Sequence, residues 1–303
     1  MKNFQWLIRR EFWENRSIWL VPAVIGAVLV FGAVFGHVHF GEDFFRPDGN
    51  QGGIPAHFTL FVLTAAVGAS FLIVASLTAS WYLLDCLYAD RKDRSILFWK
   101  SLPVSDTETV LSKLAIGLLV LPLVYLLIAD LTIFLMSFVL SLRVGVWGGS
   151  GLWRADIWLQ TQGMALYLIA TMAIWYLPIA AWFLLVSAWA SRAVILWSIL
   201  PPLAIYLMER YFFGTHLFGS WLAERSGTGY AMRAFHLPGD GAAWVSTTLQ
   251  NGPGTETMTT PTSLWAVMDF GGFFGSWATW AGVAIGVAMI VATIQIRARR
   301  SEI

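Results

Sequence analysis

Long stretches without formal charge limit most strongly what this chain can fold into. A helix that crosses a lipid bilayer needs about 20 mostly apolar residues. Five stretches approach or exceed this length, and only two of them contain a charge. They are 18–36, 58–84, 114–142 with Asp130 inside it, 163–208 with Arg192 inside it, and 270–296. The stretch 163–208 is long enough for two crossings with a tight turn at Arg192.

The overall composition agrees with lipid as the main solvent of the chain. Of the 303 residues, 57% are hydrophobic and 12% are charged, whereas soluble domains carry about 25% charged residues. Too few polar residues remain to cover a soluble fold of this size. The net charge of +1 gives no reason to expect a nucleic-acid partner.

The sequence therefore predicts an all-α polytopic membrane protein that forms a single domain over 1–303. The predicted parts are an interfacial helix at 1–17, six spans at 18–39, 58–84, 114–142, 163–189, 193–213 and 270–296, a cytoplasmic loop at 85–113, and a long extracytoplasmic segment at 214–269.

The distribution of Lys and Arg predicts which side each loop faces, because cytoplasmic loops carry an excess of these residues. Most of the 19 Lys and Arg lie in four segments. These are the N-terminal segment, the loop 85–113, the turn at Arg192 and the C-terminal tail. We therefore expect both termini and the loop 85–113 to be cytoplasmic, in a multi-pass protein of the inner (cytoplasmic) membrane.

The N-terminal segment has the pattern of a helix lying on the membrane surface. Its apolar residues share one helical face: Phe4, Leu7, Ile8 and Phe12. Arg9 and Arg16 fall on the opposite face, so the segment is typical of an interfacial helix. Glu11 does not fit, because it lands inside the apolar arc. An unstructured basic tail is the alternative.

The loop 85–113 concentrates charge of both signs in "LYADRKDRSILFWKSLPVSDTETVLSK", residues 87–113. Asp90 and Arg94 stand four residues apart, which favours a helix, and Ile96 to Trp99 form an apolar cluster beside the charges. Leu102 precedes a proline, so that helix should end there. We interpret the loop as a short amphipathic helix held between two rigid spans.

A capping box should start the next helix. Ser105 and Glu108 have the spacing at which the serine hydroxyl and the glutamate carboxylate bond each other's backbone N–H groups. A loop with this much local order favours a docking element over a passive connector, since its movement would be transmitted to spans two and three.

Two stretches of the chain resemble the permease subunits of type-2 ATP-binding-cassette (ABC) exporters. They are "RREFWENRSIW" at 9–19 and residues 87–113, above all "SLPVS" with the acidic segment and Lys113 that follow. In that family the loop between spans two and three contains the coupling helix, which contacts a cytoplasmic ATPase. The resemblance implies that the contact residues here are Asp90, Arg91, Lys92, Asp93, Arg94, Ile96, Leu97, Phe98 and Trp99, with Arg192 as a lesser contact.

The same resemblance implies the partners and the cofactors. It implies two copies of a cytoplasmic ABC ATPase that bind ATP and Mg²⁺, a second permease copy in a homodimer, and an N-terminal elbow helix at 2–16. No cofactor is expected on this chain. The family often has a short re-entrant hairpin between spans five and six, and the segment 214–269 is much longer, so no outer-gate residue is transferred.

The sequence contains no catalytic signature that would make the chain an enzyme. It lacks the G-x-x-x-x-G-K-[ST] pattern that binds nucleotide phosphates, the zinc motif H-E-x-x-H and the nucleophile motif G-x-S-x-G. The single cysteine, Cys86, excludes an internal disulfide. The loop with His37, His39 and His57 near Glu42 and Asp43 is interpreted as a wet polar loop, and no metal site is predicted.

Asp130 is the only acidic residue well inside a predicted span. An ionisable group costs about 2.5–3.5 kcal/mol at the centre of a membrane on insertion scales. We therefore expect Asp130 to face the bundle interior or a transport pathway, and the alternative is a packing hydrogen bond to a neighbouring Ser, Thr or Tyr. Pro178, Pro201 and Pro202 should bend spans four and five.

The resulting hypothesis is a permease subunit that forms the pathway for an amphipathic or hydrophobic substrate, such as a peptide, a drug or a lipid. A non-transporting scaffold or sensor that binds partners through its outer loop is the alternative. An intramembrane enzyme is a third reading, which would need a convergent polar set on the spans. The sequence offers little for such a set beyond Asp130.

Overall fold

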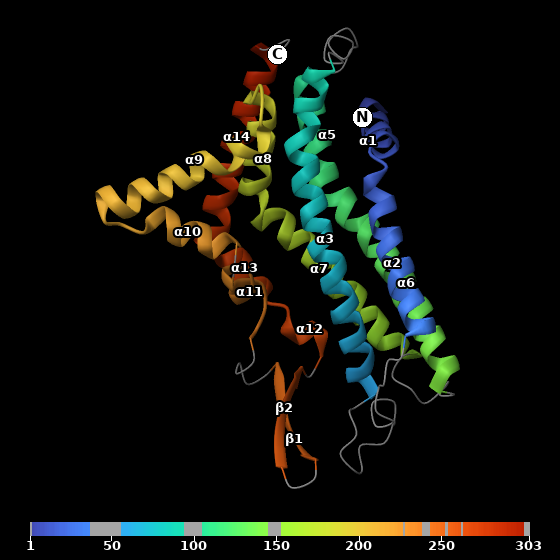
Figure 1. Cartoon of the computed structure of the whole chain (residues 1–303). Helices are drawn as coiled ribbons and strands as arrows, with labels where there is room; N and C mark the ends of the chain where they lie inside the picture. The colour runs from blue at the N-terminus through green and yellow to red at the C-terminus, as the bar shows by residue number, and fades with distance from the viewer. Residues whose placement is uncertain are drawn as a thin grey trace.

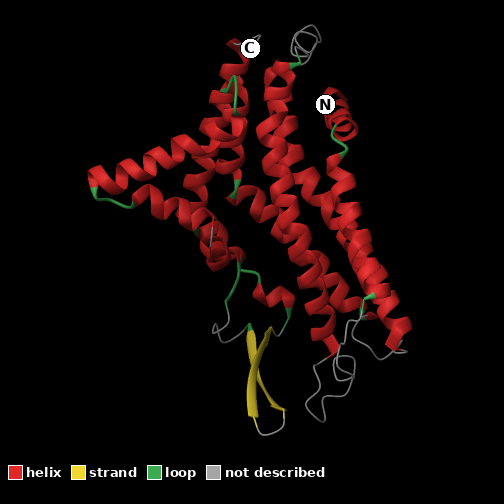
Figure 2. Ribbon diagram, viewed as in Figure 1, coloured by secondary structure: helices red, strands yellow, loops and turns green. Residues whose placement is uncertain are grey.

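A computed structural model describes residues 2–36, 56–93, 105–144, 153–226, 228–237, 243–251, 254–261 and 263–299 (Figures 1 and 2). In chain order, its elements are α1 (Lys2–Glu14), α2 (Ser17–Phe35), α3 (Ala56–Lys92), α5 (Asp106–Ala115), the π-helix η3 (Ile116–Val120), α6 (Leu121–Val144), α7 (Ala155–Trp175), α8 (Leu177–Trp189), α9 (Val194–Met208), the π-helix η5 (Glu209–Phe213), α10 (Leu217–Ser226), α11 (Thr228–Ala234), β1 (Trp244–Asn251), β2 (Gly254–Pro261), α12 (Leu264–Val267), α13 (Phe270–Gly275) and α14 (Trp277–Arg299).

Within the described residues, five helical stretches are long and apolar enough to cross a membrane. They are Ser17–Phe35, Leu63–Lys92, Asp106–Arg143, Ala155–Trp175 and Trp277–Arg299. The chain is therefore a helical, multi-pass membrane protein, as the sequence predicts. The third stretch is one continuous helical run, in which α5, η3 and α6 follow one another without a break.

The predicted fourth span, 163–189, is divided into two helices. Helix α7 ends at Trp175, Tyr176 leaves helical geometry with φ −88° and ψ 3°, and α8 begins at Leu177. Pro178 is the second residue of α8, so the predicted interruption at this proline is confirmed. At 13 residues, α8 alone is shorter than a typical crossing.

The predicted fifth span, 193–213, coincides with α9 and η5. Ala193 has a positive φ of 50° immediately before α9, and the helix then continues through Pro201 and Pro202 without a break. In Figure 1, α9 leaves the bundle at a wide angle and its far end turns back through α10. Most large side chains of α9 are exposed, whereas Ser198 is buried, as suits an apolar helix surrounded by lipid.

Small residues bring the main helices of the bundle close together. Helix α2 packs on α6, α3 packs on α6 and α8, and α14 packs on α8. A side chain at Gly26 of α2 would meet Thr132, and one at Gly286 of α14 would meet Leu177. Close approach at small residues is a common basis of helix packing in membranes.

The described residues of the segment 214–269 form short helices and a β-hairpin. The short helices α10, α11 and α12 agree with the expectation that so long a segment has structure of its own. Strands β1 and β2 pair antiparallel, from Trp244 opposite Pro261 to Asn251 opposite Gly254. The predicted all-α fold class is therefore wrong for this hairpin, and it holds for the bundle.

Arg225 anchors α10 to the bundle. Its side chain is 1% exposed, and its guanidinium carbon lies 4.1 Å from the centre of the Trp175 ring. Its Nη1 donates a 2.7 Å hydrogen bond to the Trp175 carbonyl, and its Nη2 donates to the Ala278 carbonyl. Arg225 thus joins the end of α7 to the start of α14, and Gly282 leaves room for the guanidinium.

One end of the bundle gathers segments that are far apart in the sequence. In Figure 1, α1, the C-terminal end of α14, the end of α3 and the start of α5 all lie at that end. The turn between α8 and α9 lies there as well (Figure 1). The segments that are rich in Lys and Arg therefore lie together at one end of the molecule.

Candidate functional site

The predicted cytoplasmic loop 85–113 begins as part of helix α3. This helix continues without interruption to Lys92, eight residues beyond the predicted end of span two at residue 84. The predicted contact residues Arg94, Ile96, Leu97, Phe98 and Trp99 lie outside the described residues. The description resumes at Ser105.

The predicted capping box starts the next helix. The Ser105 hydroxyl accepts a 3.1 Å hydrogen bond from the Glu108 N–H, and a Glu108 carboxylate oxygen accepts a 3.1 Å bond from the Ser105 N–H. This geometry fixes the direction in which the chain enters α5. The short connection between Lys92 and Ser105 thus joins two ends that are both held by the fold.

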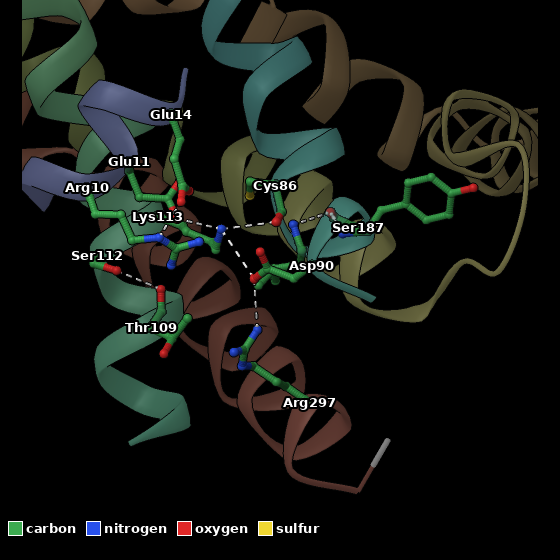
Figure 3. A network of polar contacts seen from close by, with 12 residues as sticks. Arg10, Glu11, Glu14, Cys86, Asp90, Thr109, Ser112, Lys113, Ser187 and Arg297 are labelled. Carbon is green, nitrogen blue, oxygen red and sulfur yellow. Dashed lines mark hydrogen bonds and ion pairs between the residues drawn. The ribbon is translucent and has the colours of Figure 1, made fainter. Parts of the chain in front are cut away.

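Asp90, a predicted contact residue, faces the interior of the chain. Its Oδ2 lies 3.4 Å from Lys113 Nζ and 3.4 Å from Arg297 Nη1. Only 9% of its side chain is exposed. Because helix α3 ends two residues later, this carboxylate ties the end of α3 to both α5 and α14 (Figure 3).

Lys113 extends the contact to the first helix of the chain. Its Nζ lies 2.8 Å from Glu11 Oε1 and donates a 3.0 Å hydrogen bond to the Cys86 carbonyl. The other oxygen of Glu11 accepts a 2.9 Å hydrogen bond from the Tyr82 hydroxyl. The Lys113 and Glu11 side chains are 3% and 5% exposed, so this ion pair is buried.

Arg297 completes the group on the side of α14. Its Nε donates a 2.9 Å hydrogen bond to Asp106 Oδ1, and Asp106 is the first residue of α5. We call Glu11, Asp90, Asp106, Lys113 and Arg297 the ion cluster. It joins α1, α3, α5 and α14 at one end of the bundle (Figure 3).

The ion cluster makes the relative positions of these four helices depend on charge pairing. Burying a charge is costly unless it is paired and hydrogen-bonded. Removing one member of a buried pair costs about 3–5 kcal/mol, because the partner is left without compensation. Independent movement of the four helix ends would break these buried ion pairs. We therefore expect the four ends to move together.

A cleft of about 660 Å³ opens beside the ion cluster, between α1 and α3. Glu11, Tyr82 and Lys113 line its wall, and the exposed side chains of Trp81 and Asp85 also border it. The cleft gives the N-terminal helix room to shift against α3 if the cluster opens.

Arg91, the second predicted contact residue, is also turned inward. Its Nη2 donates 2.7 Å hydrogen bonds to the carbonyls of Ser187 and Ala190. A basic side chain that bonds the last carbonyls of a helix stabilises its C-terminus, and here that helix is α8. The Ser187 hydroxyl in turn accepts hydrogen bonds from the N–H groups of Leu87 and Tyr88.

The remaining described contact residues are exposed. Lys92 and Asp93 stand at the end of α3 with exposed side chains, and Arg192 is exposed in the turn between α8 and α9. Arg91 connects the end of α3 to the residues just before that turn. The structure therefore brings the two predicted contact regions together through Arg91.

Asp130 lies apart from the ion cluster. Its Oδ1 accepts a 2.8 Å hydrogen bond from Gln162 Nε2 of α7. The partner is thus a glutamine, whereas the packing alternative named Ser, Thr or Tyr. Asp130 also borders a cavity between α3, α6 and α7. Its role in a pathway stays a prediction.

Four members of the ion cluster were not predicted as site residues: Glu11, Asp106, Lys113 and Arg297. Glu11 gave a usable signal, because a carboxylate inside an apolar helical face needs a buried cationic partner. Lys113 and Arg297 gave none, since cations near the ends of spans are expected from the orientation rule alone.

No metal ligand set or reactive thiol stands out in the described part of the chain. Within that part, no three His, Cys, Asp or Glu residues come together in a group that could hold a metal ion. His37, His39, Glu42 and Asp43 lie outside it. Cys86 is buried, and its carbonyl serves as an acceptor for Lys113.

The chain matches no protein-family model, no curated protein and no solved structure.

Proposed function

We propose that the chain is the membrane-spanning permease subunit of an ATP-driven ABC exporter in the inner membrane. It would work as a homodimer with two copies of a separate cytoplasmic ATPase. The observation that carries the proposal is the ion cluster, because it connects four helices at the two ends of the segment expected to contact the motor.

The arrangement around residues 94–104 suits the transmission of force. The segment leaves α3 two residues after Asp90 and enters α5 at Asp106, and both residues belong to the ion cluster. A push on so short a connection acts on two anchored ends. Because Glu11 and Arg297 are bonded to the same cluster, α1 and α14 would follow α3 and α5.

The buried positions of Asp90 and Arg91 give these residues a positioning role. Their side chains bond within the chain, so contact with the ATPase falls to the exposed Lys92 and Asp93 together with residues 94–99. Arg192 would be a second contact. Arg91 would link the two contacts, since it bonds the end of α8 just before the turn.

We propose that the motor is a different polypeptide. The sequence has no P-loop that could hold nucleotide phosphates, so ATP and Mg²⁺ would bind the partner. The spans would then change the exposure of a pathway for an amphipathic or hydrophobic substrate, without bond chemistry on this chain.

Co-purification tests the proposal against the scaffold alternative. The tagged chain, extracted in mild detergent with the products of its neighbouring genes, should bring down a protein that can be photolabelled with azido-ATP. The double variant Lys92→Glu, Arg94→Glu should lose at least about tenfold of this protein, because reversed charges repel a docked partner.

The matched control reverses two exposed cations at the same end of the bundle. Arg9→Glu with Arg299→Glu makes the same change in net charge outside the proposed contact, so this variant should retain the ATP-labelled partner. The absence of any ATP-labelled partner from the unmodified chain would refute the permease assignment. Equal loss in both double variants would refute the assigned contact.

A further inference from the structure

A cavity of about 350 Å³ lies inside a single copy of the chain, between α3, α6, α7 and α12. It is distinct from the ion cluster, which lies at the end of the bundle. The volume falls in the range of pockets that hold small organic molecules. Its walls are almost entirely apolar, and they include Phe71, Leu72, Ile133, Met164, Leu168 and Leu264.

The sequence of α3 explains why the space is open. Ala65, Gly68, Ala69 and Ala75 all border the cavity, and a helix that presents small side chains leaves a hollow beside its larger neighbours. A Cβ atom built at Gly68 would have no atom within 4 Å. A leucine at this position would therefore occupy the cavity without a clash at Cβ.

Asp130 supplies one negative group to these apolar walls. Its Oδ1 accepts the hydrogen bond from Gln162. Across the part of the chain that the structure describes, no other hydrogen bond or ion pair to Asp130 is formed, which leaves Oδ2 as an acceptor. A carboxylate in such surroundings favours a cationic partner, because pairing offsets the cost of holding its charge away from water.

The outer segment covers one end of the cavity. Leu264 of α12 lines it, and the Leu264 N–H donates a 3.1 Å hydrogen bond to Gln160 Oε1 of α7. The neighbouring Trp265 ring lies against Gly163. The cavity thus has an apolar body, one acidic group and Leu264 of α12 at one end.

From this geometry, we propose that the cavity binds an apolar molecule carrying a single protonated amine. The ammonium group pairs with Asp130, and the apolar body fills the space beside Gly68. The inference builds on the proposed function, because it gives the exported substrate a chemical class and a place within one subunit. Its test uses the purified chain without an ATPase, so each of the two proposals can fail alone.

Two photoreactive probes of equal length test the site: a diazirine-bearing decylamine and the matching decanol. The full chain is reconstituted in lipid nanodiscs, irradiated with each probe and analysed by mass spectrometry. The amine should label residues that line the cavity, such as Leu72 and Met164, at least about tenfold more than the alcohol does. A charge-assisted hydrogen bond in a partly buried site has about this effect.

Two variants separate the contributions of charge and of space. Asp130→Asn keeps the size of the side chain and should reduce labelling by the amine to the level of the alcohol. Gly68→Leu should abolish labelling by both probes. Gly32→Leu is the matched control, because a Cβ at Gly32 also has no atom within 4 Å and Gly32 does not border the cavity.

Three results together would support the site. Amine labelling falls to the level of the alcohol in Asp130→Asn, is abolished in Gly68→Leu and is kept in Gly32→Leu. Equal labelling by amine and alcohol, unchanged in Asp130→Asn, would overturn it, because the cavity would then hold lipid chains without regard to charge. Labelling that spares the cavity would overturn it as well. Monodisperse elution of each variant shows that the comparison is between folded proteins.

Discussion

Lys113 Nζ lies 2.8 Å from Glu11 Oε1 in a buried ion pair, although 102 positions separate the two residues in the sequence. The pair ties the N-terminal helix to the beginning of the third membrane-crossing stretch. Asp90 and Arg297 extend the connection to the second and the last. Helices α1, α3, α5 and α14 are therefore held in the same cluster.

Removing the central cation of this cluster should destabilise the protein strongly. In Lys113→Met, Glu11 loses its buried cation and Asp90 keeps only Arg297, while the side chain stays unbranched and nearly as long. We expect a loss of about 3–5 kcal/mol, measured as a lower midpoint of unfolding in detergent. Glu11→Gln combined with Lys113→Met should recover part of the loss, because it also removes the carboxylate that is left unpaired.

The exposed ion pair between Arg10 and Glu14 is the control for this prediction. Its side chains are 24% and 52% exposed, and exposed pairs contribute about 0–1 kcal/mol. Arg10→Met should therefore change the unfolding midpoint much less. Equal effects of Lys113→Met and Arg10→Met would mean that the ion cluster does not hold the helices together.

Arg297 should hold the end of α14 against α3 and α5, whereas Arg299 should not. Arg297→Gln removes the contacts with Asp90 and Asp106, so the last turns of α14 should exchange amide hydrogens faster. Arg299→Gln alters an exposed side chain two residues further on and should leave exchange unchanged. The prediction fails if the two variants exchange alike.

Arg91 should control the order of the turn between α8 and α9. Arg91→Ala removes the donor to the carbonyls of Ser187 and Ala190, so we expect faster hydrogen exchange over 187–193. The change should cost about 1–3 kcal/mol, the usual cost of leaving buried polar groups unpaired. Lys92→Ala, at the exposed neighbouring position, is the control and should behave like the unmodified chain.

Gly163 should be needed for the docking of α12. A Cβ at this position would fall on the Trp265 ring, and overpacking of this kind costs about 1–3 kcal/mol. Gly163→Ala should therefore raise hydrogen exchange over 263–268. Gly32→Ala adds the same methyl group in open space and should have no effect. Unchanged exchange in Gly163→Ala would contradict the packing of Trp265 on α7.

The membrane-crossing helices could be predicted from the sequence because their signal is local. Uncharged stretches of about 20 residues, the capping box at Ser105 and Glu108, and the break at Pro178 each depend on residues that are neighbours in the chain. The sequence did not show that helix α3 continues past residue 84, because Asp90 and Arg91 bond distant partners that a local pattern does not contain.

The ion cluster and the buried Arg225 depend on contacts between distant segments. Arg225 looks like an ordinary cation of an outer loop, and its burial follows from the meeting of α7, α10 and α14. The hairpin at 244–261 was missed because its strands are rich in Thr and have little of the apolar alternation that identifies a half-buried strand. The direction in which α9 leaves the bundle could not be predicted, because its sequence is uniformly apolar and does not distinguish one helix face from another.

Photocrosslinking from residue 98 tests the central claim most directly. Phe98 is replaced by benzoylphenylalanine in the full chain, cells are irradiated, and products are probed with azido-ATP. We predict that this position forms an adduct with an ATP-binding protein. The adduct should be absent when the same group replaces Leu159, an exposed residue near the opposite end of the bundle. The absence of a crosslink from position 98 to any ATP-binding protein would contradict the proposed function. Reaction of Phe98→Cys with a membrane-impermeant maleimide added outside intact cells would contradict it as well.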